Sequence, residues 1–165
     1  MKPYFIQDDD GNYLNPNYIF NIQVIRFCNL GSLFAFETIK KAKTSSPDLP
    51  SFKNIETYNV HSWMESFHKI FPDFEEELNS YSCENLNLKS FEMSDLIHTE
   101  LHTELHTELH TALDRDKISH INSIYENNIF KYFEIIYIDS DQATIREFES
   151  EELAQAWINE NFVII

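Results

Sequence analysis

The residues best suited to chemistry are four histidines spaced four positions apart. Residues 98–113 read HTEL HTEL HTEL HTAL, which places histidines at His98, His102, His106 and His110. Residues four apart share one face of a helix, and two imidazoles placed in this way can hold zinc, nickel or copper. A complete metal site needs three or four converging ligands, which one helix does not supply. Metal binding by these histidines is therefore an alternative hypothesis, beside a tandem repeat that simply forms an amphipathic helix.

The repeat does not have the spacing of a zinc protease. The protease signature needs glutamate directly after the first histidine, whereas Thr99 follows His98 and the acid comes one position later, at Glu100. The repeat also places Leu101, Leu105, Leu109 and Leu113 on a ridge. A leucine ridge left exposed would be an interface between chains. Homo-oligomerisation through this ridge is therefore a further alternative.

A second group of candidate residues is a set of carboxylates near the C-terminus. The six acids are Asp139, Asp141, Glu147, Glu149, Glu151 and Glu152. Carboxylates bind guanidinium and ammonium groups through charge-assisted hydrogen bonds, and complementary charge raises the rate and specificity of association. The alternative is a solvated surface that keeps the chain in solution. The sequence predicts that these acids form a docking surface for a Lys/Arg-rich protein.

The distribution of charge supports this interpretation. Residues 1–71 contain seven acids and seven bases, whereas residues 72–165 contain 21 acids and five bases, so the net charge of −16 lies in the second part. A field of this sign repels nucleic acid and anionic membranes and attracts basic partners. We therefore expect a basic protein partner, and neither a nucleic-acid partner nor a membrane.

The composition excludes several classes of cofactor-dependent enzyme. The only glycines are Gly11 and Gly31, so neither a P-loop nor a dinucleotide-binding turn can be written. The only cysteines, Cys28 and Cys83, make no disulfide framework, and no run of about 18 apolar residues is present. We expect a cytoplasmic protein that has no cofactor and is not an enzyme.

The apolar pattern predicts both strands and helices. Alternation of apolar residues predicts a strand over 18–25, and an i, i+3, i+4, i+7 pattern predicts a helix over 60–71. A short strand is expected at 4–6 and a helix over 33–43, ending in lysines. The repeat is expected to lie in a long helix from residue 94 to about residue 125.

The C-terminal third has the clearest pattern. Residues 129–138 and 143–148 read as the two strands of a hairpin, Ser150 as the cap of a helix, and 162–165 as a final strand. The sequence therefore predicts a single α+β domain over 1–165 with a mainly antiparallel sheet. It also predicts a C-terminal β-hairpin–helix unit and a long central helix.

In size, acidity and lack of a catalytic motif, the chain resembles small bacterial immunity proteins and antitoxins. The resemblance is one of composition, so it carries over no individual residue. It implies a protein that neutralises a basic, nuclease-type toxin by direct binding. Three alternatives remain open: a DNA mimic that inhibits a nucleic-acid-binding protein, a metal-binding protein that uses the histidine repeat, and an enzyme of an unrecognised family.

Overall fold

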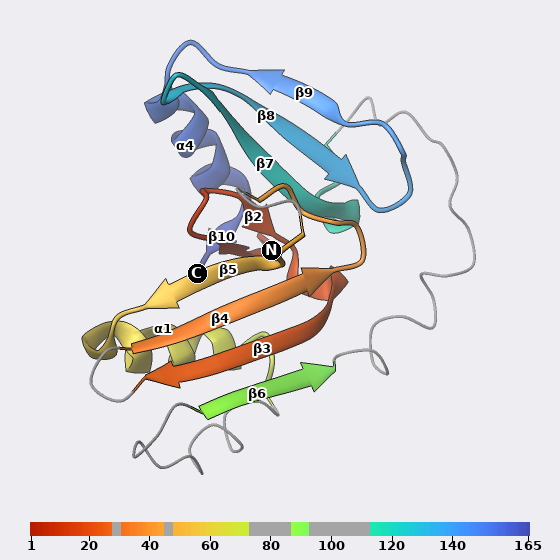
Figure 1. The fold of residues 1–165 in the computed structure, drawn as a ribbon. Coiled ribbons are helices and arrows are strands. Elements are labelled where there is room, and N and C mark those ends of the chain that lie inside the picture. The colour runs from red at the N-terminus through yellow and green to blue at the C-terminus, as the bar shows by residue number, and fades with distance from the viewer. Residues whose placement is uncertain (28–30, 45–47, 73–86, 93–112) are drawn as a thin grey trace.

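The computed structural model describes residues 1–27, 31–44, 48–72, 87–92 and 113–165. These residues form two β-sheets, and one α-helix packs on a face of each sheet (Figure 1). The N-terminal and C-terminal ends lie near each other, where the two sheets meet (Figure 1).

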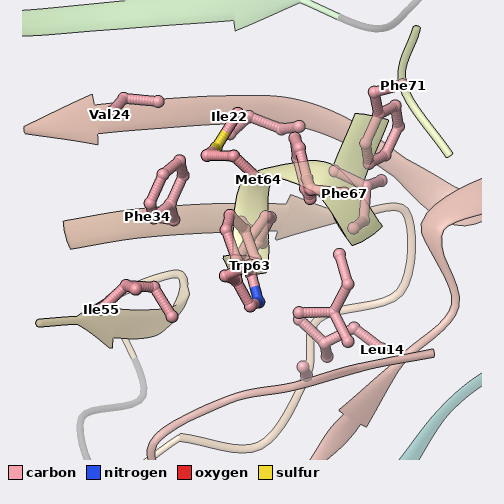
Figure 2. Close-up of a cluster of buried hydrophobic side chains, with 13 residues drawn as sticks. Leu14, Ile22, Val24, Phe34, Ile55, Trp63, Met64, Phe67 and Phe71 are labelled. Atoms are coloured by element: carbon pink, nitrogen blue, oxygen red, sulfur yellow. The ribbon is translucent and has the colours of Figure 1, made fainter. Parts of the chain in front are cut away.

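The first sheet has four strands and carries the helix α1 (Thr57–His68). Its order is β5-β4-β3-β6, and every neighbouring pair is antiparallel. The strands are β3 (Ile19–Phe27), β4 (Gly31–Thr38), β5 (Ser51–Ile55) and β6 (Asn87–Glu92). Phe34 of β4 meets Trp63 and Phe67 of the helix in a buried aromatic cluster (Figure 2). Phe36, two residues further along β4, also contacts Phe67.

The second sheet has six strands in the order β10-β1-β2-β7-β8-β9. Only the pair β1–β10 is parallel. The strands are β1 (Tyr4–Gln7), β2 (Tyr13–Leu14), β7 (Ile118–Glu126), β8 (Ile129–Tyr137), β9 (Thr144–Glu147) and β10 (Val163–Ile164). The helix α4 (Glu151–Asn161) buries Trp157 and Ile158 against Phe133 and its neighbours. Two 3₁₀ turns, Pro16–Tyr18 and Arg115–Lys117, precede β3 and β7.

The short strands β1 and β2 connect the two hydrophobic cores. Successive side chains of a strand point to opposite faces. Phe5 and Tyr13 accordingly belong to the core under α4, whereas Ile6 and Leu14 belong to the core under α1. The two sheets therefore pack against each other through the strands that follow the N-terminus.

The predicted fold class, an α+β domain with a long central helix, is wrong. The described chain is mostly strand, and its two α-helices have only 12 and 11 residues. Within the predicted helix over 94–125, Arg115–Lys117 is a 3₁₀ turn and Ile118–Glu126 is the strand β7; residues 94–112 lie outside the described residues. The β-branched residues Ile118, Ile121 and Ile124 suit a strand, and pairing with β8 overrides the helical spacing.

The predicted helix over 33–43 is also wrong, because residues 31–38 form β4. Burial alternates along this segment, and Phe34 and Phe36 point to the core while Leu33 and Ala35 are half-buried. The predicted strands at 4–6, 18–25, 129–138 and 143–148 and the helices at 60–71 and after Ser150 match β1, β3, β8, β9, α1 and α4.

Candidate protein-binding surface

Four of the predicted binding residues come together where β9 leads into α4. Glu147 ends β9, Glu149 lies in the link, and Glu151 and Glu152 occupy the first turn of the helix. All four are exposed, and we call this group the acidic corner. The Ser150 hydroxyl between them accepts a hydrogen bond from the Leu153 amide at 3.2 Å and so caps the helix. The partial positive charge of the helix N-terminus favours the two carboxylates placed there.

The carboxylates of the acidic corner are not neutralised by the bases that the structure describes. None of the ion pairs between described residues includes any of the four. The nearest base in sequence, Arg146, instead stacks its guanidinium over the Trp157 ring at 4.7 Å and the Phe148 ring at 5.6 Å. Arg146 therefore covers the aromatic edge of the core, and the carboxylates stay available to a cation from another molecule.

One neutral group does contact the corner. The Tyr125 hydroxyl donates a hydrogen bond to the Glu151 carboxylate at 2.8 Å. Burial, followed by the adjacent Glu151 carboxylate, raises the pKa of Tyr125 to about 12. The tyrosine consequently remains a neutral donor that orients Glu151 without removing its negative charge.

The other two predicted residues, Asp139 and Asp141, lie at the opposite end of β9. Figure 1 shows the β8–β9 turn and the β9–α4 link at opposite ends of this strand. A strand rises about 3.3 Å per residue, which puts the first and last residues of β9 about 10 Å apart. The structure therefore divides the six predicted carboxylates into two separate groups.

The Asp139–Asp141 turn already has cations of its own. The Lys117 ammonium lies 2.9 Å from the Asp139 carboxylate, whose side chain is only 14% exposed. The Lys40 ammonium reaches across from the end of β4 and donates hydrogen bonds to the carbonyl oxygens of Tyr137, at 2.6 Å, and Ser140. Desolvation lowers the pKa of Lys40, while Asp141 and Asp139 oppose that shift. The Lys40 contacts fix the turn to the end of β4 in the first sheet, and Lys117 already pairs with Asp139, which makes the turn a weaker candidate for binding a partner.

Most of the remaining candidate residues, those of the histidine repeat, lie outside the described residues. His98, His102, His106 and His110 lie outside the described residues, as do three of the four ridge leucines. Leu113, the fourth, packs against the core under α4. Among the residues that the structure describes, no three His, Cys, Asp or Glu side chains are placed to hold a metal ion.

A row of buried polar groups between the two sheets was not anticipated from the sequence. Asn15 donates to the Ile118 carbonyl at 2.7 Å, and the Lys43 amide donates to the Asn122 side chain at 3.3 Å. His120 is 2% exposed, and its Nδ1 lies 3.2 Å from the Ser119 hydroxyl. Desolvation, together with the nearby Lys40, lowers the pKa of His120 to about 4. The histidine is therefore neutral in the folded protein at neutral pH.

The turn between β1 and β2 contains a buried acid, Asp8, whose pKa is raised by burial, whereas burial lowers the pKa of His120. The Asp8 carboxylate is 6% exposed and accepts hydrogen bonds from the Asp10 and Asn12 amides at 3.0 and 2.8 Å. Burial raises its pKa to about 6, although the bonds from Asn12 oppose the shift and the neighbouring Asp10 charge adds to it. Asp8 therefore takes up a proton in the folded state at a higher pH than in the unfolded chain.

Asp8 and His120 are expected to give opposite pH dependences of stability. Between pH 6.5 and 4 the unfolded chain binds a proton at His120 that the folded state does not, which removes up to about 3 kcal/mol of stability. Below about pH 6 the folded state binds a proton at Asp8 that the unfolded chain does not, which adds up to about 3 kcal/mol. Relative to wild type, His120→Gln should gain stability and Asp8→Asn should lose it on acidification. Urea unfolding at pH 6.5 and 4.5 measures both, and parallel behaviour of all three proteins would contradict these assignments.

The described residues also form a partly apolar pocket outside the acidic corner. Exposed side chains of Phe20, Ile39 and Leu49 line a space of about 350 Å³ at one end of the four-stranded sheet. Glu37, Lys41 and Asp48 also line it, and the Lys41 and Asp48 side chains lie 3.9 Å apart. This pocket is an alternative contact surface among the described residues.

Comparison with models of protein families, with curated proteins and with solved structures finds no match to this chain. Within the described residues, none of the helices combines the length and the apolar character needed to cross a bilayer.

Proposed function

We propose that this chain is a binding protein of the immunity type, which neutralises a basic, nuclease-type toxin through the acidic corner. The observation that carries the proposal is the group of four exposed carboxylates at the β9–α4 link, which lack ion-pair partners among the described residues. The net charge of −16 supports it, because a field of this sign accelerates association with a basic protein.

The mechanism follows from the chemistry of the target. A nuclease holds the phosphates of its substrate with Lys and Arg side chains. The same cations can form charge-assisted hydrogen bonds with Glu147, Glu149 and Glu152. A protein bound in this way covers the surface that nucleic acid would occupy, and thus blocks the substrate. Because such a target would act on nucleic acid inside the cell, cytoplasmic localisation is part of the proposal.

The experiment compares two variants that each remove three negative charges. The corner variant carries Glu147→Gln, Glu149→Gln and Glu152→Gln. The control variant carries Asp48→Asn, Glu56→Gln and Glu65→Gln, which lie in and around the first sheet and are also exposed. The acids that it removes from ion pairs, Asp48 and Glu65, belong to pairs that stabilise little because their side chains are 99% and 67% exposed.

Each tagged protein is incubated with lysate of the native host, eluted with a salt gradient and analysed by mass spectrometry. Wild type and control should retain the same basic protein at near-equal stoichiometry, and the corner variant should bind it about 30-fold more weakly. The purified partner should cleave nucleic acid, and wild type should inhibit it. Equal retention by all three proteins, or a retained protein without nuclease activity, would contradict the proposal.

A further inference from the structure

Among the residues that the structure describes, strand β9 has a hydrogen-bonding neighbour on one side only. It is the last strand of the six-stranded sheet and pairs with β8 from Thr144↔Ile135 to Glu147↔Tyr132. The register contains no bulge, and the strand contains neither proline nor lysine, which are common protections of an edge. The outer edge of β9 is thus a regular row of backbone donors and acceptors.

At the edge of the other sheet, by contrast, backbone groups of β5 are already hydrogen-bonded. There the Asp9 amide donates to the Phe52 carbonyl at 2.8 Å, and the Asp9 carboxylate accepts from the Asn54 amide at 3.1 Å. The β1–β2 turn thereby occupies backbone groups of β5 that another strand would otherwise use. Among the described residues, no comparable contact is made to the outer edge of β9.

The side chains of β9 suit an added strand that carries both apolar and basic residues. Ile145 is 49% exposed and shares its face of the sheet with Glu147, because residues two apart point the same way. Directly across from Ile145 on β8 stands Glu134. On the opposite face Arg146 is held over Trp157. An incoming strand would therefore meet an apolar side chain flanked by carboxylates.

From this geometry we infer that β9 accepts an extended, Lys/Arg-containing segment of the partner as a seventh strand of the sheet. The inference rests on the proposed function, since the acidic corner continues directly from the end of β9. An apolar residue of the segment would face Ile145, and a basic residue two positions away would face Glu147. Main-chain hydrogen bonds would supply affinity, and the alternating side chains would supply specificity.

The charge around β9 favours a basic partner over a second copy of this chain as the added strand. Pairing two copies through β9 would place the acidic corner of one copy beside either the acidic corner or the Asp139–Asp141 turn of the other, and like charges at an interface oppose association. A basic segment meets the same carboxylates with the opposite sign. The four residues of β9 offer about four outward hydrogen bonds, a short contact that needs the added attraction of the corner.

A synthetic peptide tests this inference on the full chain. The probe is an acetylated, amidated octapeptide in which lysine or valine alternates with threonine. The control peptide has the same charge, but its two central threonines are replaced by proline, which prevents strand pairing. The readout is amide hydrogen exchange of residues 144–147 measured by NMR. We expect the probe to slow exchange of the outward amides at least about tenfold, and the control peptide to leave them unchanged.

Two proline variants then separate strand pairing from simple charge attraction. Neighbouring amides of a strand point to opposite edges, so only one of Thr144 and Ile145 directs its N–H outward. Of Thr144→Pro and Ile145→Pro, one should therefore keep an unfolding midpoint close to that of wild type and lose peptide protection, while the other loses stability.

The remaining outcomes overturn the inference in distinguishable ways. If both peptides shift only the resonances of the acidic corner, without protecting β9, strand addition is wrong and charge-driven docking survives. If neither peptide binds, strand addition is wrong, and the capture experiment with the corner variant decides the proposed function separately.

Discussion

Replacing Phe67 with alanine is expected to lower the free energy of unfolding by about 3–5 kcal/mol. The ring is fully buried and lies 4.6 Å from the ring of Trp63 and 4.8 Å from that of Phe71. It also contacts Phe34 and Phe36 of β4 at centroid distances of 6.1 and 6.4 Å. Truncation leaves a cavity at the point where α1 meets the sheet, and the surrounding rings cannot close it without leaving their own contacts.

A matched control on the same helix is Tyr58→Ala. Tyr58 is 79% exposed, so its truncation should change the free energy of unfolding by less than about 0.5 kcal/mol. Urea unfolding followed by tryptophan fluorescence measures both variants. Similar small losses for the two would mean that α1 does not pack on the four-stranded sheet in the way described.

Gly31→Ala is expected to destabilise the four-stranded sheet by about 3 kcal/mol or more. Gly31 has φ +123°, a conformation that residues with a side chain rarely adopt. A Cβ atom at this position would lie 2.1 Å from the Ile55 carbonyl oxygen, which belongs to the neighbouring strand β5. Because the clashing atom is backbone, relief requires β4 and β5 to separate.

Gly11→Ala provides the comparison for this second prediction. Gly11 also has a positive φ, +81°, but the nearest atom to an added Cβ would be the Tyr125 hydroxyl oxygen at 3.8 Å, an ordinary contact. The loss should therefore be about 1 kcal/mol, from backbone conformation alone. Thermal unfolding of the two variants separates the effects. Equal shifts of the melting temperature would contradict the close approach of β5 to Gly31.

Local sequence pattern predicted the elements that local interactions determine. The hairpin and the helix after Ser150 follow from alternating apolar residues and a capping serine, and both are present. The helix predicted through Ile118, Ile121 and Tyr125 failed because that spacing also fits a strand whose pairing lies elsewhere in the chain. The sequence does contain a signal for a hairpin at this point, the pair Asn127-Asn128, because asparagine tolerates the positive φ values of a two-residue hairpin turn. In the structure these residues have φ values of 52° and 62°.

The candidate site could be predicted only in part, for a similar reason. Sequence proximity correctly brought Glu147, Glu149, Glu151 and Glu152 to one corner. It also grouped them with Asp139 and Asp141, which β9 holds at its other end. The lysine that reaches the Asp139–Asp141 turn, Lys40, lies about a hundred residues away in the chain, so no local pattern could reveal that contact.

The most direct test of the acidic corner as the binding surface is hydrogen exchange with and without the purified partner. We expect protection to appear in residues 144–152, which cover β9, its link to α4 and the first turn of that helix. The backbone amides of the residues that line the pocket, such as Phe20, Ile39 and Leu49, should exchange at the same rate with and without the partner. Protection confined to that pocket, with residues 144–152 unchanged, would contradict the account.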